Sequence, residues 1–178
     1  MTDSVFYKAI RIGDLDTFKE YLHNGFDPSI DDNRPFRWGA FYGHPEIVKI
    51  LLLDNRVDPC SENNYAIRWT SVNGHLNIVK LLLNDERVDP SSVSNYAIRW
   101  ASENGQCEIV ELLLTDERVD PSSVSNYAIR WASENGHKEV VKLLFKDKRV
   151  RDSLKKEDIN GLIEVEYKLY KLNNLMNT

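Results

Sequence analysis

"NYAIRWASENG" spans residues 95–105 and recurs, letter for letter, at residues 126–136. The copy belongs to a longer one, because residues 85–105 recur complete at residues 116–136. The chain's tryptophans follow the same step of 31 residues, and so do four glycines and four asparagines. These positions are Trp38, Trp69, Trp100 and Trp131; Gly43, Gly74, Gly105 and Gly136; and Asn33, Asn64, Asn95 and Asn126. A period kept over four copies predicts a repeat architecture.

The sequence of each repeat predicts two helices joined by a glycine turn. In the first helix, Ala97, Trp100 and Ala101 share one face at the spacing of an α-helix, with Ile98 beside them. Gly105 ends this helix, because glycine adopts the left-handed conformation at low cost. The second run, residues 106–117, carries an apolar stripe formed by Ile109, Val110, Leu112, Leu113 and Leu114. The sequence RVDPS then ends the unit, since Pro cannot continue a helix and Asp favours an Asx turn.

A single helix pair of this size cannot bury both of its faces, whereas stacked neighbours can, which predicts a solenoid. The recurring tryptophans are expected to be buried between successive units. Truncation of a buried Trp to Ala costs about 3–5 kcal/mol. We therefore interpret Trp38, Trp69, Trp100 and Trp131, together with the four turn glycines, as structural residues.

The stretch GHLNIVKLLLNDERVDP, residues 74–90, resembles the ankyrin repeat, and RPFRWGAFYGH, residues 34–44, resembles the opening of that repeat. The resemblance covers about residues 3–150 and implies an all-α ankyrin-repeat solenoid of about five helix–loop–helix repeats. We expect one domain over residues 1–178. Its repeats are expected at about 3–32, 33–63, 64–94, 95–125 and 126–152, with a C-terminal helical cap at 153–178.

Two features depart from the family pattern. The period is 31 residues, against about 33 in the family, so the finger loops are shortened. The Thr and His of the family's T-P-L-H motif are replaced by Tyr96 and Arg99 and their equivalents. We expect a compact loop at residues 91–95, leading directly into the inner helix, in place of a β-hairpin.

The C-terminal cap is expected to cover the last repeat. Leu162, Val165, Leu169 and Leu172 form an apolar stripe at helical spacing, and the lysines and glutamates between them are expected to face water.

Composition excludes several classes of protein. A net charge of −5 argues against a dedicated nucleic-acid binder and against a basic membrane-binding surface. No apolar run approaches the length of a membrane span, and the N-terminus lacks the apolar segment of a secretory signal. Cys60 and Cys107 occur in unrelated contexts and are interpreted as free thiols. These features predict a cytoplasmic protein that is not secreted.

The motifs of catalysis are missing from the sequence. It has no GxSxG, no Cys–His arrangement and no phosphate-binding glycine loop. His44, His75 and His137 recur at the start of the outer helices, where a structural role is favoured over metal binding. We therefore expect no enzyme activity, no metal and no cofactor.

Two rows of side chains recur on the inner helices. One holds an arginine before each tryptophan, and the other begins the helices with tyrosine, or with Arg34 in the second repeat. The structural alternative is that each arginine donates to loop carbonyls of the adjoining repeat. Arg99 with Glu103, and Arg130 with Glu134, are also at the spacing of helical ion pairs. The functional alternative is a partner-binding concave face, since Arg and Tyr are common at binding hot spots. Its candidates are Arg34, Tyr65, Arg68, Tyr96, Arg99, Glu103, Tyr127, Arg130 and Glu134.

These features favour a non-catalytic protein–protein interaction module. We expect a monomer in preference to a homo-oligomer. The sequence pattern NYAIRWASENGH resembles that of the multi-copy ankyrin proteins of giant amoeba-infecting DNA viruses. This resemblance implies a host protein as partner. The alternative is a structural protein that self-associates through its C-terminal helical cap.

Overall fold

The computed structural model describes residues 4–176 of the chain, and the side chains of residues 4–172. The chain divides into two compact units, the first ending at Pro90 and the second beginning at Ser91. Each unit is built from helix pairs in which an inner helix packs against the outer helix that follows it.

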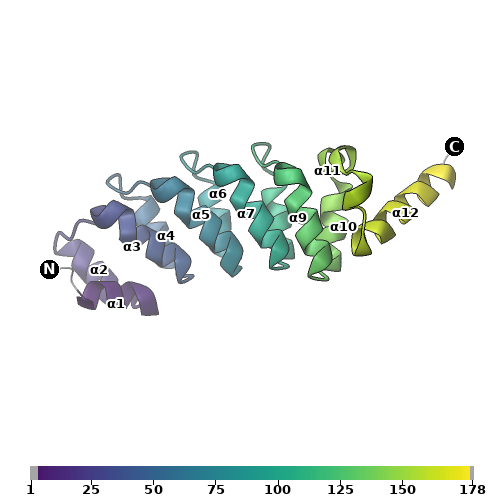
Figure 1. The fold of residues 1–178 in the computed structure, drawn as a ribbon. Coiled ribbons are helices and arrows are strands. Elements are labelled where there is room, and N and C mark those ends of the chain that lie inside the picture. Colours follow the sequence, from purple (N-terminus) through teal and green to yellow (C-terminus); the bar gives the residue numbers. More distant parts are fainter. Residues whose placement is uncertain (1–3, 177–178) are drawn as a thin grey trace. The chain divides into compact units, whose positions relative to one another are not determined.

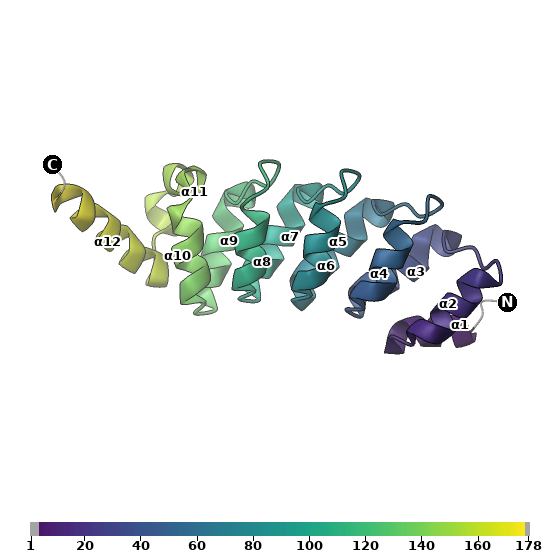
Figure 2. The ribbon, with the colours of Figure 1, turned by 180° about the vertical axis from the view of Figure 1, so that it is seen from behind.

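The first unit holds three helix pairs. Its inner helices contact one another in chain order, and its outer helices do the same on the other side (Figures 1 and 2). The inner helices are α1 (Ser4–Ile12), α3 (Ile30–Phe41) and α5 (Ser61–Asn73). The outer helices are α2 (Leu15–His23), α4 (Pro45–Leu52) and α6 (Leu76–Leu83).

The second unit holds two such pairs and the C-terminal cap. The pairs are α7 (Ser92–Glu103) with α8 (Cys107–Leu113), and α9 (Ser123–Glu134) with α10 (Lys138–Lys146). The cap consists of α11 (Lys148–Ser153), a short 3₁₀ turn η1 (Lys156–Asp158) and α12 (Gly161–Met176). The predicted all-α repeat of helix pairs is confirmed, and no residue of the described part of the chain is in a strand.

The core of each pair joins small inner residues to branched outer ones. Ala97, Ile98 and Ala101 of α7 are fully buried, as are Val110 and Leu113 of α8. Leu112 and Leu114, which were predicted in the same stripe, are only half-buried. Alanine on the inner helix lets the outer helix approach closely, so that its Val and Leu side chains fill the space.

The glycine turns are closed by histidines of the next repeat. Gly105 has a φ of 71°, and a Cβ there would lie 2.7 Å from Nδ1 of His137. The Nε2 atom of His137 is 3.0 Å from the carbonyl oxygen of Glu103, in the preceding repeat. His44 and His75 make the same contact, with the carbonyls of Arg11 and Phe41. The predicted structural role of these histidines is confirmed, although they bond the preceding repeat and do not cap their own helices.

In place of the compact loop expected before the inner helix, a left-handed turn of three residues lies within the first turn of α3, α5, α7 and α9. Val93, Ser94 and Asn95 have φ values of 53°, 55° and 60°. The same conformation occurs at residues 31–33, 62–64 and 124–126. A left-handed helical conformation costs about 1–2 kcal/mol for each residue other than glycine. Such a turn persists only where the surrounding contacts hold it.

The third residue of each turn is a buried asparagine, and in three repeats it bonds the loop that follows the outer helix of the same repeat. Asn95 is 9% exposed, and its Oδ1 accepts the backbone N–H of Asp120 at 2.7 Å. Asn33 and Asn64 accept from Asp58 and Asp89 in the same way, both at 2.8 Å. Asparagine also tolerates the left-handed region better than most residues. The recurring asparagines therefore set the turn and tie it to the loop at the end of the same repeat.

The loops that follow the outer helices form the predicted Asx turns. Oδ1 of Asp120 accepts the backbone N–H of Ser122 at 2.9 Å, and Asp27 and Asp58 do the same for the residues two places on. Arg149 pairs with Asp147 and donates to the carbonyl of Val119 in the preceding repeat at 2.8 Å. Its hydrogen bonds lower the pKa of Asp147.

The cap packs differently from the prediction. The expected stripe is wrong: Val165, Leu169 and Leu172 are 51%, 49% and 57% exposed, and Leu162 is half-buried. The anchor of α12 is Ile163, which is fully buried, and Tyr170 contacts Phe145 with ring centroids 6.0 Å apart. The side of α12 that carries Ile163 contacts α9 and α10, and the leucines lie on the opposite side of the same helix.

Replacement of Asn95 with Ala should destabilise the fold by about 1–3 kcal/mol, because it leaves the backbone N–H of Asp120 without its acceptor. The matched control is Ser94→Ala, at an exposed position with nearly the same φ. Urea unfolding followed by circular dichroism measures both, and equal losses of stability would contradict the assigned role of the amide.

Candidate functional site

The candidate side chains lie on the inner helices, on the face away from the outer helices. In the second unit this inner-helix face carries Tyr96, Arg99 and Trp100 of α7, with Tyr127 and Trp131 of α9. In the first unit it carries Tyr7 of α1, with Arg34, Arg37, Trp38, Tyr65, Arg68 and Trp69 of α3 and α5. All except Tyr7 and Trp131 are half-buried.

The arginine that precedes the tryptophan clamps the left-handed turn of its own repeat in three of the four repeats. Nε of Arg99 donates to the carbonyl of Ser94 at 2.8 Å, and Nη2 donates to that of Val93 at 3.1 Å. Arg37 and Arg68 bond their own turns in the same way. The sequence-based expectation of bonds to the adjoining repeat's loop is wrong, because the turn brings two carbonyls within reach of the same helix.

The arginines are also stacked between tyrosines. The guanidinium of Arg99 lies 5.8 Å from the ring centroid of Tyr96 and 5.1 Å from that of Tyr127 in the next repeat. In the first unit Arg37 lies 5.4 Å from Tyr65, and Arg34 lies 5.6 Å from Tyr7. Contacts between a cation and an aromatic face contribute about 0.5–1 kcal/mol each at exposed sites. They fix the arginine and the tyrosines as one rigid row.

The tryptophans extend this row and are not buried between repeats. The ring centroids of Tyr96 and Trp100 are 5.4 Å apart, those of Trp100 and Tyr127 6.1 Å, and those of Tyr127 and Trp131 5.6 Å. Trp38 contacts Tyr7 of the preceding repeat at 5.1 Å. The expectation that the indoles bridge repeats agrees with these contacts, but full burial was wrong, since Trp38, Trp69 and Trp100 are half-buried and Trp131 is 42% exposed. The rings lie at the surface edge of the contact between repeats.

The two acidic candidates do not pair with the arginines four residues before them. Oε2 of Glu103 accepts the hydroxyl of Tyr127 at 2.5 Å, and Oε1 of Glu134 accepts the amide of Asn160 at 3.0 Å. Burial, and the hydrogen bond to Glu103, raise the pKa of Tyr127 to about 12. Glu103 therefore holds the next inner helix, α9, and Glu134 holds the residue that precedes α12.

The last repeat uses the same residues differently. Arg130 lies 3.9 Å from Asp158 of the cap, and its buried Nε has no hydrogen-bond partner. Ser153 donates to Oδ1 of Asn126 at 2.9 Å, in the place that an aspartate N–H takes in the other repeats. The cap thus supplies to the last repeat the bond that the Asp-Pro loop supplies in the others.

A family model described as ankyrin repeats (three copies) matches residues 6–94, which is half of the chain. The chain belongs to the ankyrin-repeat family. Ankyrin repeats are generally protein–protein interaction modules. The repeat at residues 95–125 lies beyond the match, but residues 85–105 and 116–136 are identical to each other, so the ankyrin pattern continues there. No curated protein matches the chain in sequence.

The ankyrin framework carries no group of acidic, histidine or cysteine side chains suited to a metal among its described residues. Burial raises the pKa of the Cys60 and Cys107 thiols, which makes both poorer nucleophiles at neutral pH. None of the described helices has the length and apolar character needed to cross a membrane.

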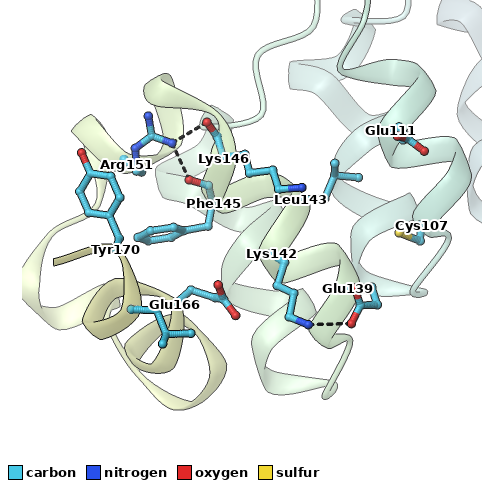
Figure 3. Close-up of a pocket in the computed structure, with 11 residues that line it drawn as sticks. Cys107, Glu111, Glu139, Lys142, Leu143, Phe145, Lys146, Arg151, Glu166 and Tyr170 are labelled. Carbon is cyan, nitrogen blue, oxygen red and sulfur yellow. Dashed lines mark hydrogen bonds and ion pairs between the residues drawn. The ribbon is translucent and has the colours of Figure 1, made fainter. Parts of the chain in front are cut away.

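A cavity of about 520 Å³ lies on the other side of the second unit, between α8, α10 and α12 (Figure 3). Phe145, Tyr170 and Leu169 line one end, while Lys142 and Glu139 pair with each other at 2.9 Å. Its charges are of both signs, and it contains no pair of groups arranged for acid–base chemistry.

Two residues of the face were missed by the sequence-based candidates, Tyr7 and Arg37. Tyr7 contacts Trp38 and Arg34, and its hydroxyl lies 3.2 Å from a carboxylate oxygen of Asp31. A step of 31 residues back from Trp38 falls on Tyr7, so the period itself could have found it. Arg37 belongs to the recurring arginines, and the tyrosine stacking of the next repeat marks it as part of the row.

Replacement of Arg99 with Lys should destabilise the fold by roughly 1 kcal/mol, because an ammonium group cannot bond both carbonyls and stack on two rings. The matched control is Arg130→Lys, at the equivalent position of the identical eleven-residue stretch. It should lower the stability by less, since Arg130 bonds no carbonyl of its own turn. Urea unfolding compares the two, and a larger loss for Arg130→Lys would refute the clamp.

Raising the pH should destabilise the protein above about pH 10, because Tyr127 ionises at 10.0 in the unfolded chain and at about 12 in the folded one. The contribution is complete below pH 10 and is lost as the pH rises through 12. Tyr127→Phe should reduce this slope. Glu103→Gln should lower the folded pKa toward 10, seen in the near-ultraviolet absorbance of tyrosinate. An unchanged titration in Glu103→Gln would rule out the hydrogen bond as a cause.

Proposed function

We propose that this ankyrin-repeat protein is a non-catalytic binding module whose protein partner lies against the inner-helix face. The observation that supports it most is the row formed by Tyr96, Trp100, Tyr127 and Trp131, with Arg99 held between its tyrosines. Tyrosine, tryptophan and arginine dominate binding hot spots. Because neighbouring rings and carbonyls already fix these side chains, a partner that binds them loses little conformational entropy.

The structure changes the weight of individual candidates. The guanidiniums of Arg68 and Arg99 are occupied by their own turns, so they act mainly as supports for the tyrosines. Arg34 is paired with Asp31, and Glu134 with Asn160. The aromatic edges, with Trp131 the most exposed, are therefore the proposed contact atoms.

We further propose that the partner is a host protein, because the sequence pattern NYAIRWASENGH resembles that of viral ankyrin proteins. In that case the module acts in the cytoplasm of the host. A nucleic-acid partner is disfavoured by the net charge of −5, which repels a phosphate backbone.

Self-association through the cap is the second candidate, favoured by the half-exposed Val165, Leu169 and Leu172 of α12. The monomer remains our first choice. Light scattering that gives a monomer at high concentration would eliminate this candidate.

Replacement of Trp131 with Ala should weaken partner binding about 30-fold or more, as expected for a hot spot worth at least about 2 kcal/mol. The partner is first identified by crosslinking mass spectrometry in expressing cells, then purified, and its affinity is measured by calorimetry.

The control for this measurement is a double variant, Glu108→Ala with Lys138→Ala, at exposed positions of the outer helices α8 and α10. It should leave the affinity within about twofold, while circular dichroism checks that both proteins fold. An affinity lost in the outer-helix variant and kept in Trp131→Ala would place the contact elsewhere.

A further inference from the structure

A second surface stands apart from the inner-helix face, where α12 leaves the body of the second unit. A groove of about 910 Å³ runs between α12 and the segment that joins α11 to it. Its apolar lining is Leu154, Ile159, Tyr167 and Leu172. We call it the C-terminal groove. Leu172 is 57% exposed, so this apolar surface is open to solvent.

The rim of the C-terminal groove is basic. Arg151, Lys156, Lys168 and Lys171 line it, against one carboxylate, that of Glu164. Glu164 is already paired with Lys168 at 2.6 Å. Lys171 lies 4.7 Å from the ring centroid of Tyr167, and Arg151 is held by the carbonyls of Phe145 and Lys146. A cluster with an excess of positive charge is therefore concentrated in a protein whose net charge is −5.

The shape of the groove suits a helix. Along α12 its lining runs from Glu164 through Lys168 to Leu172, two turns or about 12 Å at 1.5 Å per residue. Leu154 and Ile159 lie on the other side. An amphipathic helix binds such a groove by its apolar face, and its polar edge meets the rim.

We propose that the C-terminal groove is a docking site for a short amphipathic helix of a partner protein, with apolar residues on one face and aspartates or glutamates at its edges. The apolar face packs on Ile159, Tyr167 and Leu172. The carboxylates meet the ammonium groups of Lys156 and Lys171, which no carboxylate of the described residues neutralises.

Charge also separates this occupant from a membrane. A short acidic segment meets the local cations within a Debye length of about 8 Å at physiological salt. An anionic bilayer faces the whole acidic chain, with its net charge of −5, and is repelled by it. The site does not depend on the inner-helix face, so either proposal can fail while the other stands.

The test uses two fluorescent synthetic helices with leucines along one face. One carries glutamates on the polar face, and the other carries lysines at the same positions. Fluorescence anisotropy with the full chain should show saturable binding of the glutamate peptide and at least tenfold weaker binding of the lysine peptide. The affinity should fall as salt is raised.

The variants Lys156→Glu and Lys171→Glu, combined, should weaken binding of the glutamate peptide at least tenfold. The control pair Lys138→Glu and Lys146→Glu makes the same charge change at exposed positions of α10 outside the groove, and should alter the affinity less than twofold. Trp131→Ala should also leave it unchanged, which separates this site from the inner-helix face.

Three outcomes would overturn the proposal. The first is equal affinity for the two peptides, or no binding of either one. The second is an equal loss of affinity in the groove and control pairs, and the third is binding to phosphatidylserine vesicles in place of the peptide. A concentration-dependent dimer abolished by the groove pair would assign the groove to a second copy of the chain.

Discussion

The left-handed turn at the start of α3, α5, α7 and α9 is the constraint on which the rest of the structure depends. Three successive residues without the freedom of glycine adopt a conformation that costs several kcal/mol in all. Two side chains hold it in α7: Arg99 binds its carbonyls, and Asn95 at its end bonds the loop after the outer helix. The turn shortens the loop, starts the inner helix at once and orients that helix for stacking. The face that carries the tyrosines is a consequence of how this turn is stabilised.

Much of the architecture could be predicted because periodicity and backbone chemistry are local. The step of 31 residues predicts the helix pairs, Gly105 the end of the inner helix, and Asp120 with Pro121 the turn after the outer one. The left-handed turn could not be predicted, since Val93 is a poor residue for a positive φ. Only contacts from Arg99, and from the loop at Asp120 that bonds Asn95, make it stable there. Long-range support overrides local preference at that point.

The candidate face shows a similar division. Tyrosine and arginine were placed on one surface by their spacing, and the structure brings them together in a stacked row. The tryptophans were assigned to the core because large aromatic side chains are usually buried, yet alanines fill that space and the indoles lie beside the tyrosines. In the cap, helical spacing alone could not tell which of two apolar sides faces the body. The burial of Ile163 shows that its side of the helix faces the body and that the side with the leucines does not.

The recurring asparagines accept from the segment that follows the outer helix of their own repeat, which is the Asp-Pro loop in three repeats and Ser153 of the cap in the last. The donor is a main-chain N–H in the repeats, and a main-chain N–H does not depend on which amino acid carries it. Because this bond lies within one repeat, a whole repeat can be gained or lost by recombination within the gene and keep it. The identical copies at residues 85–105 and 116–136 are the record of such an event.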